Sequence, residues 1–193
     1  ARYGFARYSL RPDVTKTYNP AFHDTDDVLV GLAASGRTPY VLGAMEYAKK
    51  LGAPVIGVSC CPGSQVDEAA DIGIAPTPGP EVVTGSTRMK SGTAQKMILN
   101  MLSTGAMIRL GKVYGNLMVD VKPTNEKLVR RCVTIVCEAT GEPEGKAVQA
   151  LESCDYHCKT AIVMLLCGKT ADEARALLHR ADGRVAEALR LKD

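Results

Sequence analysis

Residues 26–40 read DDVLVGLAASGRTPY, and this stretch decides the fold. The apolar run at residues 28–34 is short and continuous, which is typical of a β-strand buried on both faces. It leads directly into small hydroxyl residues, an Arg and a Pro. Residues 39–51 then carry apolar side chains at close to helical spacing, and Gly52 follows as a stop signal. A strand that passes through a tight polar turn into a helix is the first part of a βαβ unit.

The segments that follow repeat this pattern. Residues 54–59, PVIGVS, predict a second strand, residues 65–70 a short helix, and residues 71–75, DIGIA, a third strand. Strands that alternate with helices through short connections favour a parallel sheet with right-handed crossovers. Three strands make a thin sheet, because the mean sheet has about five or six. We therefore expect a further segment or another chain to complete it.

The rest of the chain is predicted to be helical. One long helix is expected over residues 84–112, with Met97, Met101 and Met107 in a core or a subunit interface. Asp120 and Lys122 lie in the connection that follows, and we expect them to be surface charges. The sequence then predicts a C-terminal helical subdomain with helices over residues 124–139, 143–154, 157–167 and 171–190.

Composition excludes several classes of protein. The net charge of the 193 residues is only +3, which gives no support to nucleic-acid binding. No apolar run reaches the roughly 18 residues of a membrane helix, and the start, ARYGFARYSL, lacks the apolar region of a signal peptide. The seven cysteines are irregularly spaced, which predicts reduced thiols in a cytoplasmic protein. Residues 154–158, CDYHC, lack an evident fourth ligand, so we expect no metal there. No cofactor is expected either.

The turn after the first strand is the first candidate site. Ligands of open α/β sheets bind at the carboxyl ends of the strands, and Ser35, Gly36, Arg37 and Thr38 lie there, at the start of a helix. Small hydroxyl side chains, free N–H groups and the helix dipole favour an anion such as a phosphate. Arg37 adds a charge-assisted hydrogen-bond donor. The alternative is an ordinary capped turn.

A second candidate site lies at residues 80–93, PEVVTGSTRMKSGT, around the predicted start of the long helix. The candidate binding residues are Ser86, Thr87, Arg88 and Lys90. Cations are disfavoured at a helix N-terminus, so the two basic residues suggest a bound anion. Glu81 is the candidate acid/base residue. The alternative is a capping cluster, in which Glu81 orients Arg88 or the loop.

These two segments carry a family resemblance. VLVGLAASGRTPYVLGAMEYAKKLGAPVIGVS at residues 28–59 and GPEVVTGSTRMKSGTAQKMILNMLSTGAMIRLGKVYGNLMVDVKPTNEKL at residues 79–128 resemble the N-acetylmuramic acid 6-phosphate etherases. The resemblance runs from about residue 27 to the C-terminus. A hydroxyl cluster at a βα turn marks any SIS (sugar isomerase) domain, whereas TGSTRMKSGTAQK leading to NLMVDVKPTNEKL is specific to the etherases.

The resemblance implies a fold and a reaction. The fold is α/β: a SIS-type (flavodoxin-like) parallel sheet sandwiched by helices, with a C-terminal helical subdomain. Such etherases cleave the lactyl ether of N-acetylmuramic acid 6-phosphate, giving N-acetylglucosamine 6-phosphate and D-lactate in cell-wall recycling. They eliminate lactate across C2–C3 of the open-chain sugar and then add water, without a metal. One carboxyl group removes the C2 proton and a second group protonates the leaving oxygen.

One part of the chain departs from the family. The family's principal acid/base glutamates lie in an earlier half with its own phosphate turn, and residues 1–26 contain neither a Glu nor such a turn. They are predicted to form an irregular arm, followed by a partial SIS-type domain at residues 27–122 and the helical subdomain at residues 123–193. We therefore expect this chain alone to be an incomplete and inactive portion of an etherase.

Two other functions stay open at this point. One is a non-catalytic phosphosugar-binding regulatory module, similar to the glucokinase regulatory protein. The other is an aldose–ketose isomerase, which the TGSTRMKSGTAQK context disfavours. We also expect a homodimer, because a methionine-rich apolar helix beside a thin sheet is unlike the surface of a monomer.

Overall fold

The structure is a computed structural model and describes residues 27–191. The predicted arm at residues 1–26 lies outside the described residues. The chain forms two compact units, Ala1–Asn100 and Met101–Asp193, whose boundary falls within helix α3 (Lys90–Arg109). The domain boundary predicted at residue 122 remains a prediction.

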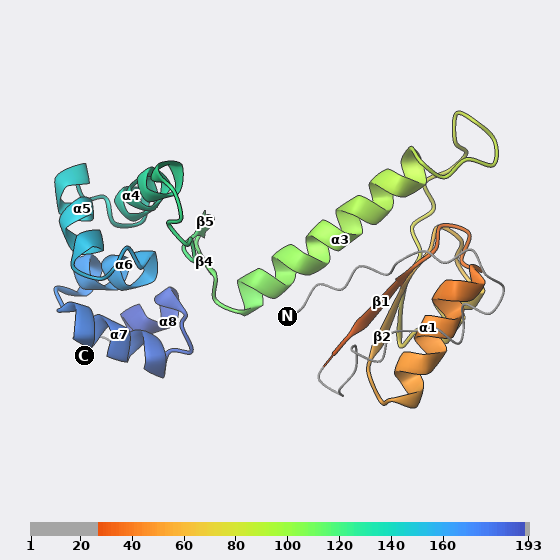
Figure 1. The fold of residues 1–193 in the computed structure, drawn as a ribbon, viewed down its shortest axis with the longest axis horizontal. Coiled ribbons are helices and arrows are strands. Elements are labelled where there is room, and N and C mark those ends of the chain that lie inside the picture. The colour runs from red at the N-terminus through yellow and green to blue at the C-terminus, as the bar shows by residue number, and fades with distance from the viewer. Residues whose placement is uncertain (1–26, 192–193) are drawn as a thin grey trace. The chain divides into compact units, whose positions relative to one another are not determined.

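The first unit contains a parallel three-stranded sheet, as the sequence predicted. Its strands are β1 (Leu29–Leu32), β2 (Val55–Val58) and β3 (Ile72–Ile74), in the spatial order β1-β2-β3. Helices α1 (Pro39–Lys50) and α2 (Gln65–Ala69) make the crossovers, and α1 lies alongside the sheet (Figure 1). The two helices also contact each other. The α/β fold class is therefore confirmed, and each of these elements agrees with its predicted bounds to within two residues.

Three glycines, one in each strand, form a row across the sheet. Gly31 is the register partner of Gly57, which in turn is the partner of Gly73. This glycine row faces α1 and α2. A Cβ atom added to the row would lie 2.9 Å from Met45 Sδ at Gly31, 2.5 Å from the Val66 carbonyl oxygen at Gly57, and 1.9 Å from Asp67 Oδ1 at Gly73. The helices therefore approach the sheet more closely than any side chain in the row would permit.

We expect Gly57→Ala to destabilise the first unit by about 1–3 kcal/mol, the usual cost of overpacking a core. The clash is with the Val66 backbone, which a rotamer change cannot relieve. Urea unfolding followed by circular dichroism measures the change. Gly145→Ala in the second unit is a matched control, because an added Cβ there meets nothing within 4 Å. We expect that control to be neutral or slightly stabilising, and an equal loss in both variants would contradict the role of the glycine row.

The long helix begins later than predicted. The sequence placed its start at residue 84, whereas α3 begins at Lys90. Gly85 has φ of 85°, and the Ser86 N–H donates to the Val83 carbonyl, so residues 83–86 form a turn. Helical periodicity cannot show this turn, because apolar and hydroxyl residues are compatible with both conformations.

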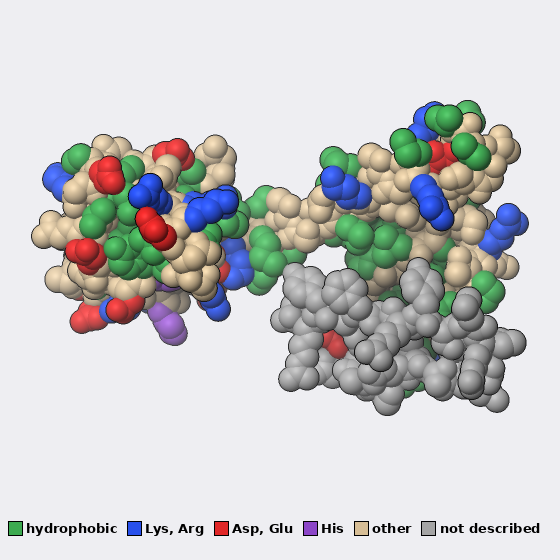
Figure 2. Space-filling model, turned by 45° about the horizontal axis from the view of Figure 1, so that its top comes forward, with side chains coloured by type: hydrophobic (Ala, Val, Ile, Leu, Met, Phe, Trp, Pro, Cys, Tyr) green, Lys and Arg blue, Asp and Glu red, His purple; other side chains and the backbone are tan. Residues whose placement is uncertain are grey.

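Much of the apolar surface of α3 is exposed. Met101 is 64% exposed and Met97 48%, so neither lies in a core of the described residues. Hydrophobic side chains are visible along the surface of α3 and of the loop before it (Figure 2). The alternative prediction for these methionines, a subunit interface, is taken up below.

The second unit is a small helical bundle with a β-hairpin packed on it. The hairpin consists of β4 (Val113–Tyr114) and β5 (Leu117–Met118), joined by a turn with Gly115 at φ of 59°. The helices are α4 (Glu126–Thr140), α5 (Glu144–Glu152), α6 (Cys158–Cys167), α7 (Ala171–Arg180) and α8 (Val185–Arg190). Helix α6 contacts the other four helices, and residues 158–163 of it are buried. The predicted helical subdomain is thus confirmed as a helical C-terminal part.

One local prediction in this unit was wrong, and one element was missed. The helix expected over residues 171–190 is broken at Asp182 and Gly183, which both have positive φ. The connection at residues 113–118 was not recognised as a hairpin, although Gly115-Asn116 between short apolar pairs is a turn signal.

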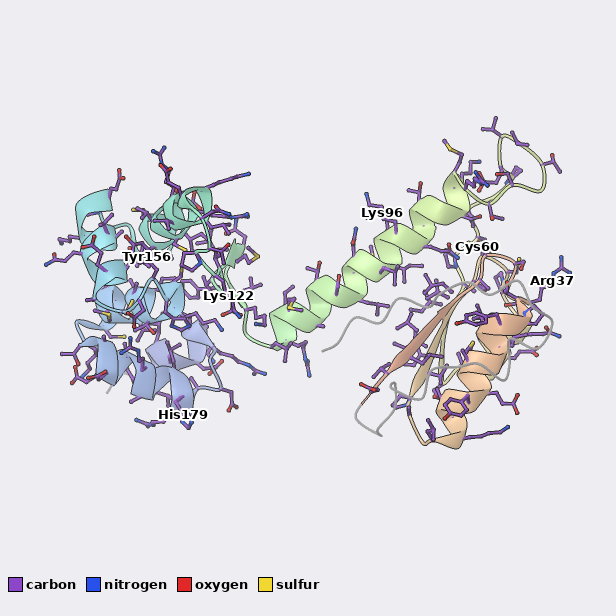
Figure 3. The ribbon with its side chains drawn as sticks, viewed as in Figure 1. Arg37, Cys60, Lys96, Lys122, Tyr156 and His179 are labelled. Atoms are coloured by element: carbon purple, nitrogen blue, oxygen red, sulfur yellow. The ribbon has the colours of Figure 1, made fainter. Side chains whose placement is uncertain are left out.

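The prediction that Asp120 is a surface charge was also wrong. Its carboxylate accepts a hydrogen bond from Lys112 Nζ and lies 3.9 Å from Lys159 Nζ. The Lys159 side chain is only 9% exposed, and that of Asp120 is 29% exposed. Lys122, by contrast, is exposed (Figure 3). Asp120 therefore balances the charge of a lysine that the bundle buries.

None of the helices in residues 27–191 combines the length and the hydropathy that crossing a bilayer requires.

Candidate functional site

The two hydroxyl-rich segments that the sequence singled out line one hollow of about 570 Å³. The hollow lies at the carboxyl end of the sheet, where β1 and β2 lead into their loops. Arg37 and Cys60 mark this end of α1 and the strands in Figure 3. The lining residues come from three loops and from the first turn of α3. They are Ala34, Ser35 and Arg37; Cys60 and Cys61; Thr77, Pro78, Gly79, Pro80, Glu81, Thr84, Gly85, Ser86 and Thr87; and Ser91 of α3.

The first wall of the hollow is the turn between β1 and α1. Gly36 has φ of 66°, and its N–H donates to the Ala33 carbonyl at 2.8 Å, which closes the turn and leaves Ser35 and Arg37 exposed. Thr38 is the N-cap of α1 by position, but its side chain makes no capping hydrogen bond. The first turn of α1 carries no acidic residue, so no side chain of that turn neutralises the partial positive charge of the helix start.

Gly36 is required for packing. A Cβ atom at this position would lie 2.0 Å from Ser64 Oγ, and the Gly36 carbonyl accepts the Val66 N–H at 2.9 Å. The sequence suggested that Gly36 allows a ligand to approach the backbone. In the structure it instead allows Ser64, from the loop after β2, to approach the backbone of the turn. Gly36 is not among the residues that line the hollow.

The second wall is the loop after β2, which is tied to the first wall. The Cys60 N–H donates to the Ala34 carbonyl at 2.9 Å. Ser59, 1% exposed, donates its hydroxyl to the Cys61 carbonyl and accepts the Cys61 N–H, and Ser64 Oγ lies 3.2 Å from Ser59 Oγ. These hydrogen bonds fix the backbone that presents Cys60 and Cys61 to the hollow.

The third wall is the loop before α3, and Glu81 closes it. Glu81 Oε2 accepts the Lys90 N–H and Oε1 accepts the Ser91 N–H, each at 3.0 Å. The carboxylate therefore caps α3 from nine residues upstream. Hydrogen bonds from the Ser91 amide, which has the larger effect, and from the Lys90 amide hold the pKa of Glu81 below its usual value. The charge of Lys90 also lowers the pKa of Glu81, so this cation lies near an anion within the chain.

The hollow contains about half of the predicted site residues. Ser35, Arg37, Ser86, Thr87 and Glu81 line it. Gly36, Thr38, Arg88 and Lys90 do not, and the side chains of the last three are exposed. Glu81 already accepts two N–H groups at the start of α3, so these two amides are not free to bind a phosphate group.

Comparison with known proteins shows what the chain is similar to. Residues 18–105 match the SIS domain family. It is 64% identical over 163 residues to the N-acetylmuramic acid 6-phosphate etherase of Aliivibrio fischeri (strain ATCC 700601 / ES114), 63% identical over 162 residues to that of Aeromonas hydrophila, and 61% identical over 163 residues to that of Klebsiella aerogenes. Each match covers 84% of this chain and 54% of the relative. The chain therefore spans about half the length of the curated relatives it matches. The resemblance to the etherases, which was inferred from residues 28–128, is confirmed.

Sequence reasoning missed several lining residues of the hollow, chiefly Cys60, Cys61, Thr77 and Ser91. The rule that ligands bind at the carboxyl ends of parallel strands was applied to the loop after β1 only. Applied to β2 and β3 as well, it would have included Cys60, Cys61 and Thr77. Ser91 carries no comparable signal, because its inward position depends on where α3 begins.

Residues 27–191 contain no group of three or more His, Cys, Asp or Glu arranged to hold a metal ion. In the CDYHC segment, Cys154 Sγ donates to the His157 carbonyl at 3.5 Å. His157 Nδ1 lies 2.6 Å from the hydroxyl of Thr160, which is buried. These side chains have partners within the bundle, which accords with a structural role.

Proposed function

We propose that this chain binds a phosphosugar in the hollow, with the phosphate at the start of α1. The observation that carries the proposal is that Ser35 and Arg37 line one cavity together with Ser86 and Thr87, although about 50 residues separate the two pairs in sequence. Hydroxyl groups and a guanidinium group are good donors to phosphate oxygens. Thr84, Ser86 and Thr87 line the same space from the third wall and offer hydroxyl groups for binding those of a sugar.

We further propose that the whole protein that carries this sequence is a carbon–oxygen lyase. Its substrate is N-acetylmuramic acid 6-phosphate, and its products are N-acetylglucosamine 6-phosphate and D-lactate. The names of relatives with 61–64% identity support this reaction. No cofactor is required, because acid–base groups perform both the elimination and the addition of water.

Glu81 acts in this proposal as a positioning residue. Both of its oxygens accept backbone N–H groups, and a carboxylate stabilised in this way is a weak base. It holds the loop with Ser86 and Thr87 against the start of α3. The catalytic role that the sequence suggested for Glu81 stays a prediction, and an activity assay given below tests it.

We expect Ser35→Ala and Ser86→Ala each to weaken binding of N-acetylglucosamine 6-phosphate by roughly 10- to 150-fold. This range corresponds to the loss of one hydrogen bond to a charged group, about 1.5–3 kcal/mol. Isothermal titration calorimetry measures the affinities. Ser153→Ala is the control, since that hydroxyl donates to the Ala150 carbonyl within the helical unit. Unchanged affinity in both site variants would remove the phosphosugar assignment.

The second candidate function is a phosphosugar-binding regulatory module without catalysis. The observation that favours it is that Glu81 is the only carboxylate lining the hollow among residues 27–191, and its two oxygens are occupied. Phosphosugar affinity without turnover by the full-length protein would select this function over the lyase.

We propose in addition that the protein is a cytoplasmic homodimer. The exposed apolar side chains of α3 support self-association, because such surfaces are seldom left open on a monomer. The side chains concerned are Met97, Leu99, Met101 and Ile108. We expect light scattering at micromolar concentration to report twice the 20.6 kDa mass of the chain. A single species of 20.6 kDa would contradict the dimer.

A further inference from the structure

Two adjacent cysteines form part of the wall of the hollow. Cys61 is exposed and Cys60 half-buried, and both line the space that Ser35, Arg37 and Ser86 enclose. Their backbone is fixed on both sides, through Ala34 and Ser59, so the position of the thiols does not depend on a mobile loop. A reagent small enough to enter the hollow therefore reaches a thiol there.

The other five cysteines lie in the helical unit and are poorly accessible. Cys132, Cys154 and Cys158 are buried, and burial raises the pKa of both Cys154 and Cys158. A thiol with a raised pKa forms little of the thiolate that reacts with disulfides and alkylating reagents. Cys137 and Cys167 are half-buried against the helical core. Cys61 is thus the only cysteine in the chain that is exposed, and residues 27–191 include all seven.

We propose that Cys61 is a modification site through which a low-molecular-weight disulfide closes the hollow to its phosphorylated ligand. This proposal rests on the phosphosugar site proposed above. In the reaction, the Cys61 thiolate attacks one sulfur of the disulfide. A protein–reagent S–S bond forms, the original S–S bond breaks, and the released thiolate takes up the proton that Cys61 lost. Cys61 is oxidised and one half of the reagent is reduced, so no other oxidant is needed.

The charge of the hollow suits an anionic disulfide. Arg37 lines the wall, and the nearby start of α1 has no acidic residue in its first turn. Oxidised glutathione carries several carboxylates and is therefore attracted to the same groups that attract a phosphate. The glutathionyl group left on Cys61 is similar in size to a phosphorylated amino sugar and occupies the space between Ser35 and Ser86.

The test treats the 193-residue chain with oxidised glutathione and maps the adduct by mass spectrometry of its peptides. Calorimetry with N-acetylglucosamine 6-phosphate follows, before and after treatment. We expect the first adduct on Cys61, slower modification when the sugar phosphate is present, and affinity reduced at least roughly tenfold, as for the loss of one charge-assisted hydrogen bond. Dithiothreitol should restore the affinity, because the mixed disulfide is reversible.

Two variants make the test specific. In Cys61→Ser, the affinities of the treated and untreated samples should be equal, whatever the affinity of the variant itself. In the control Cys137→Ser, treatment should lower affinity as in the unchanged protein. A first adduct on another cysteine, or a Cys61 adduct that leaves the affinity unaltered, would overturn the proposal. Failure of the untreated chain to bind the sugar phosphate is a separate result: it refutes the phosphosugar site, and the proposed blockade of phosphorylated ligands falls with it even if Cys61 reacts first.

Discussion

We expect the 193-residue chain to release no measurable lactate from N-acetylmuramic acid 6-phosphate, even where it binds the phosphosugar. Elimination across C2–C3 needs a base at the C2 proton and an acid at the leaving oxygen, and each such group contributes about 10²- to 10⁴-fold to the rate. Glu81 is the only carboxylate that lines the hollow among residues 27–191, and backbone amides occupy both of its oxygens. The expected loss relative to an etherase that has both groups is therefore several orders of magnitude.

A coupled assay with D-lactate dehydrogenase measures the release directly. The full-length relative from Aeromonas hydrophila, an N-acetylmuramic acid 6-phosphate etherase, is the positive control. Turnover by this chain at about 1 s⁻¹ or faster, within the usual range of enzymes, would contradict the expectation. If Glu81→Gln abolished that turnover without weakening phosphosugar binding, Glu81 would be a catalytic residue after all.

The largest expected effect on stability is that of Asp120→Asn in the helical unit. Removing one partner of a buried ion pair typically costs about 3–5 kcal/mol, and we expect about 3 kcal/mol here because Asp120 is partly exposed. The change leaves Lys159, 9% exposed, with its charge uncompensated and Lys112 close by. Urea unfolding followed by circular dichroism at 222 nm measures the difference in the free energy of unfolding.

Lys159→Met is the matched control for this prediction. Replacing a buried charge by an apolar side chain of similar length is often neutral or stabilising, so Asp120→Asn should cost little in a Lys159→Met background. Equal losses in both backgrounds would show that Asp120 acts through Lys112 alone. An exposed pair, Arg190 with Glu187, should contribute no more than about 1 kcal/mol.

The Asp120 carboxyl group should also make the stability of the helical unit depend on pH. The hydrogen bond from Lys112, followed by the charge of Lys159, holds the pKa of Asp120 below its usual value. A carboxyl group whose pKa is lowered by folding stabilises the folded state above its unfolded pKa, about 3.9 for Asp. We therefore expect this contribution to be complete at neutral pH and to disappear as the pH falls through the lowered pKa. Asp120→Asn should remove that part of the acid sensitivity.

Most of the first unit could be predicted from the sequence, because its signals are local. The apolar runs at residues 28–34 and 54–59 end at polar turns, and Pro39 and Gly52 delimit α1. The start of α3 was not predictable in this way. It depends on Glu81, which binds amides nine and ten residues away and keeps residues 83–89 out of the helix. Local periodicity does not record a contact of that kind.

The candidate site was predicted only in part, for a related reason. Ser35, Arg37, Ser86 and Thr87 were found because hydroxyl and basic residues gather at two helix starts. The part played by Gly36 could not be inferred, because it depends on Ser64 approaching from a different loop. Asp120 was mistaken for a surface charge for the same reason, since Lys159 reaches it from 39 residues further along the chain.

The glycine row also determines how the strands align. Successive residues of a strand point to opposite faces, so a slip of one residue would exchange the two faces of that strand. A slip of β2 would place Ile56 or Val58 beneath α2, where even a methyl group at Gly57 would lie 2.5 Å from the Val66 carbonyl oxygen. Parallel ladders with evenly spaced hydrogen bonds do not by themselves favour one alignment over its neighbours. In this sheet a misaligned pairing would bring a side chain into the row that glycines now occupy, and that side chain would clash with the helices. Only the correct register allows α1 and α2 to pack against the sheet.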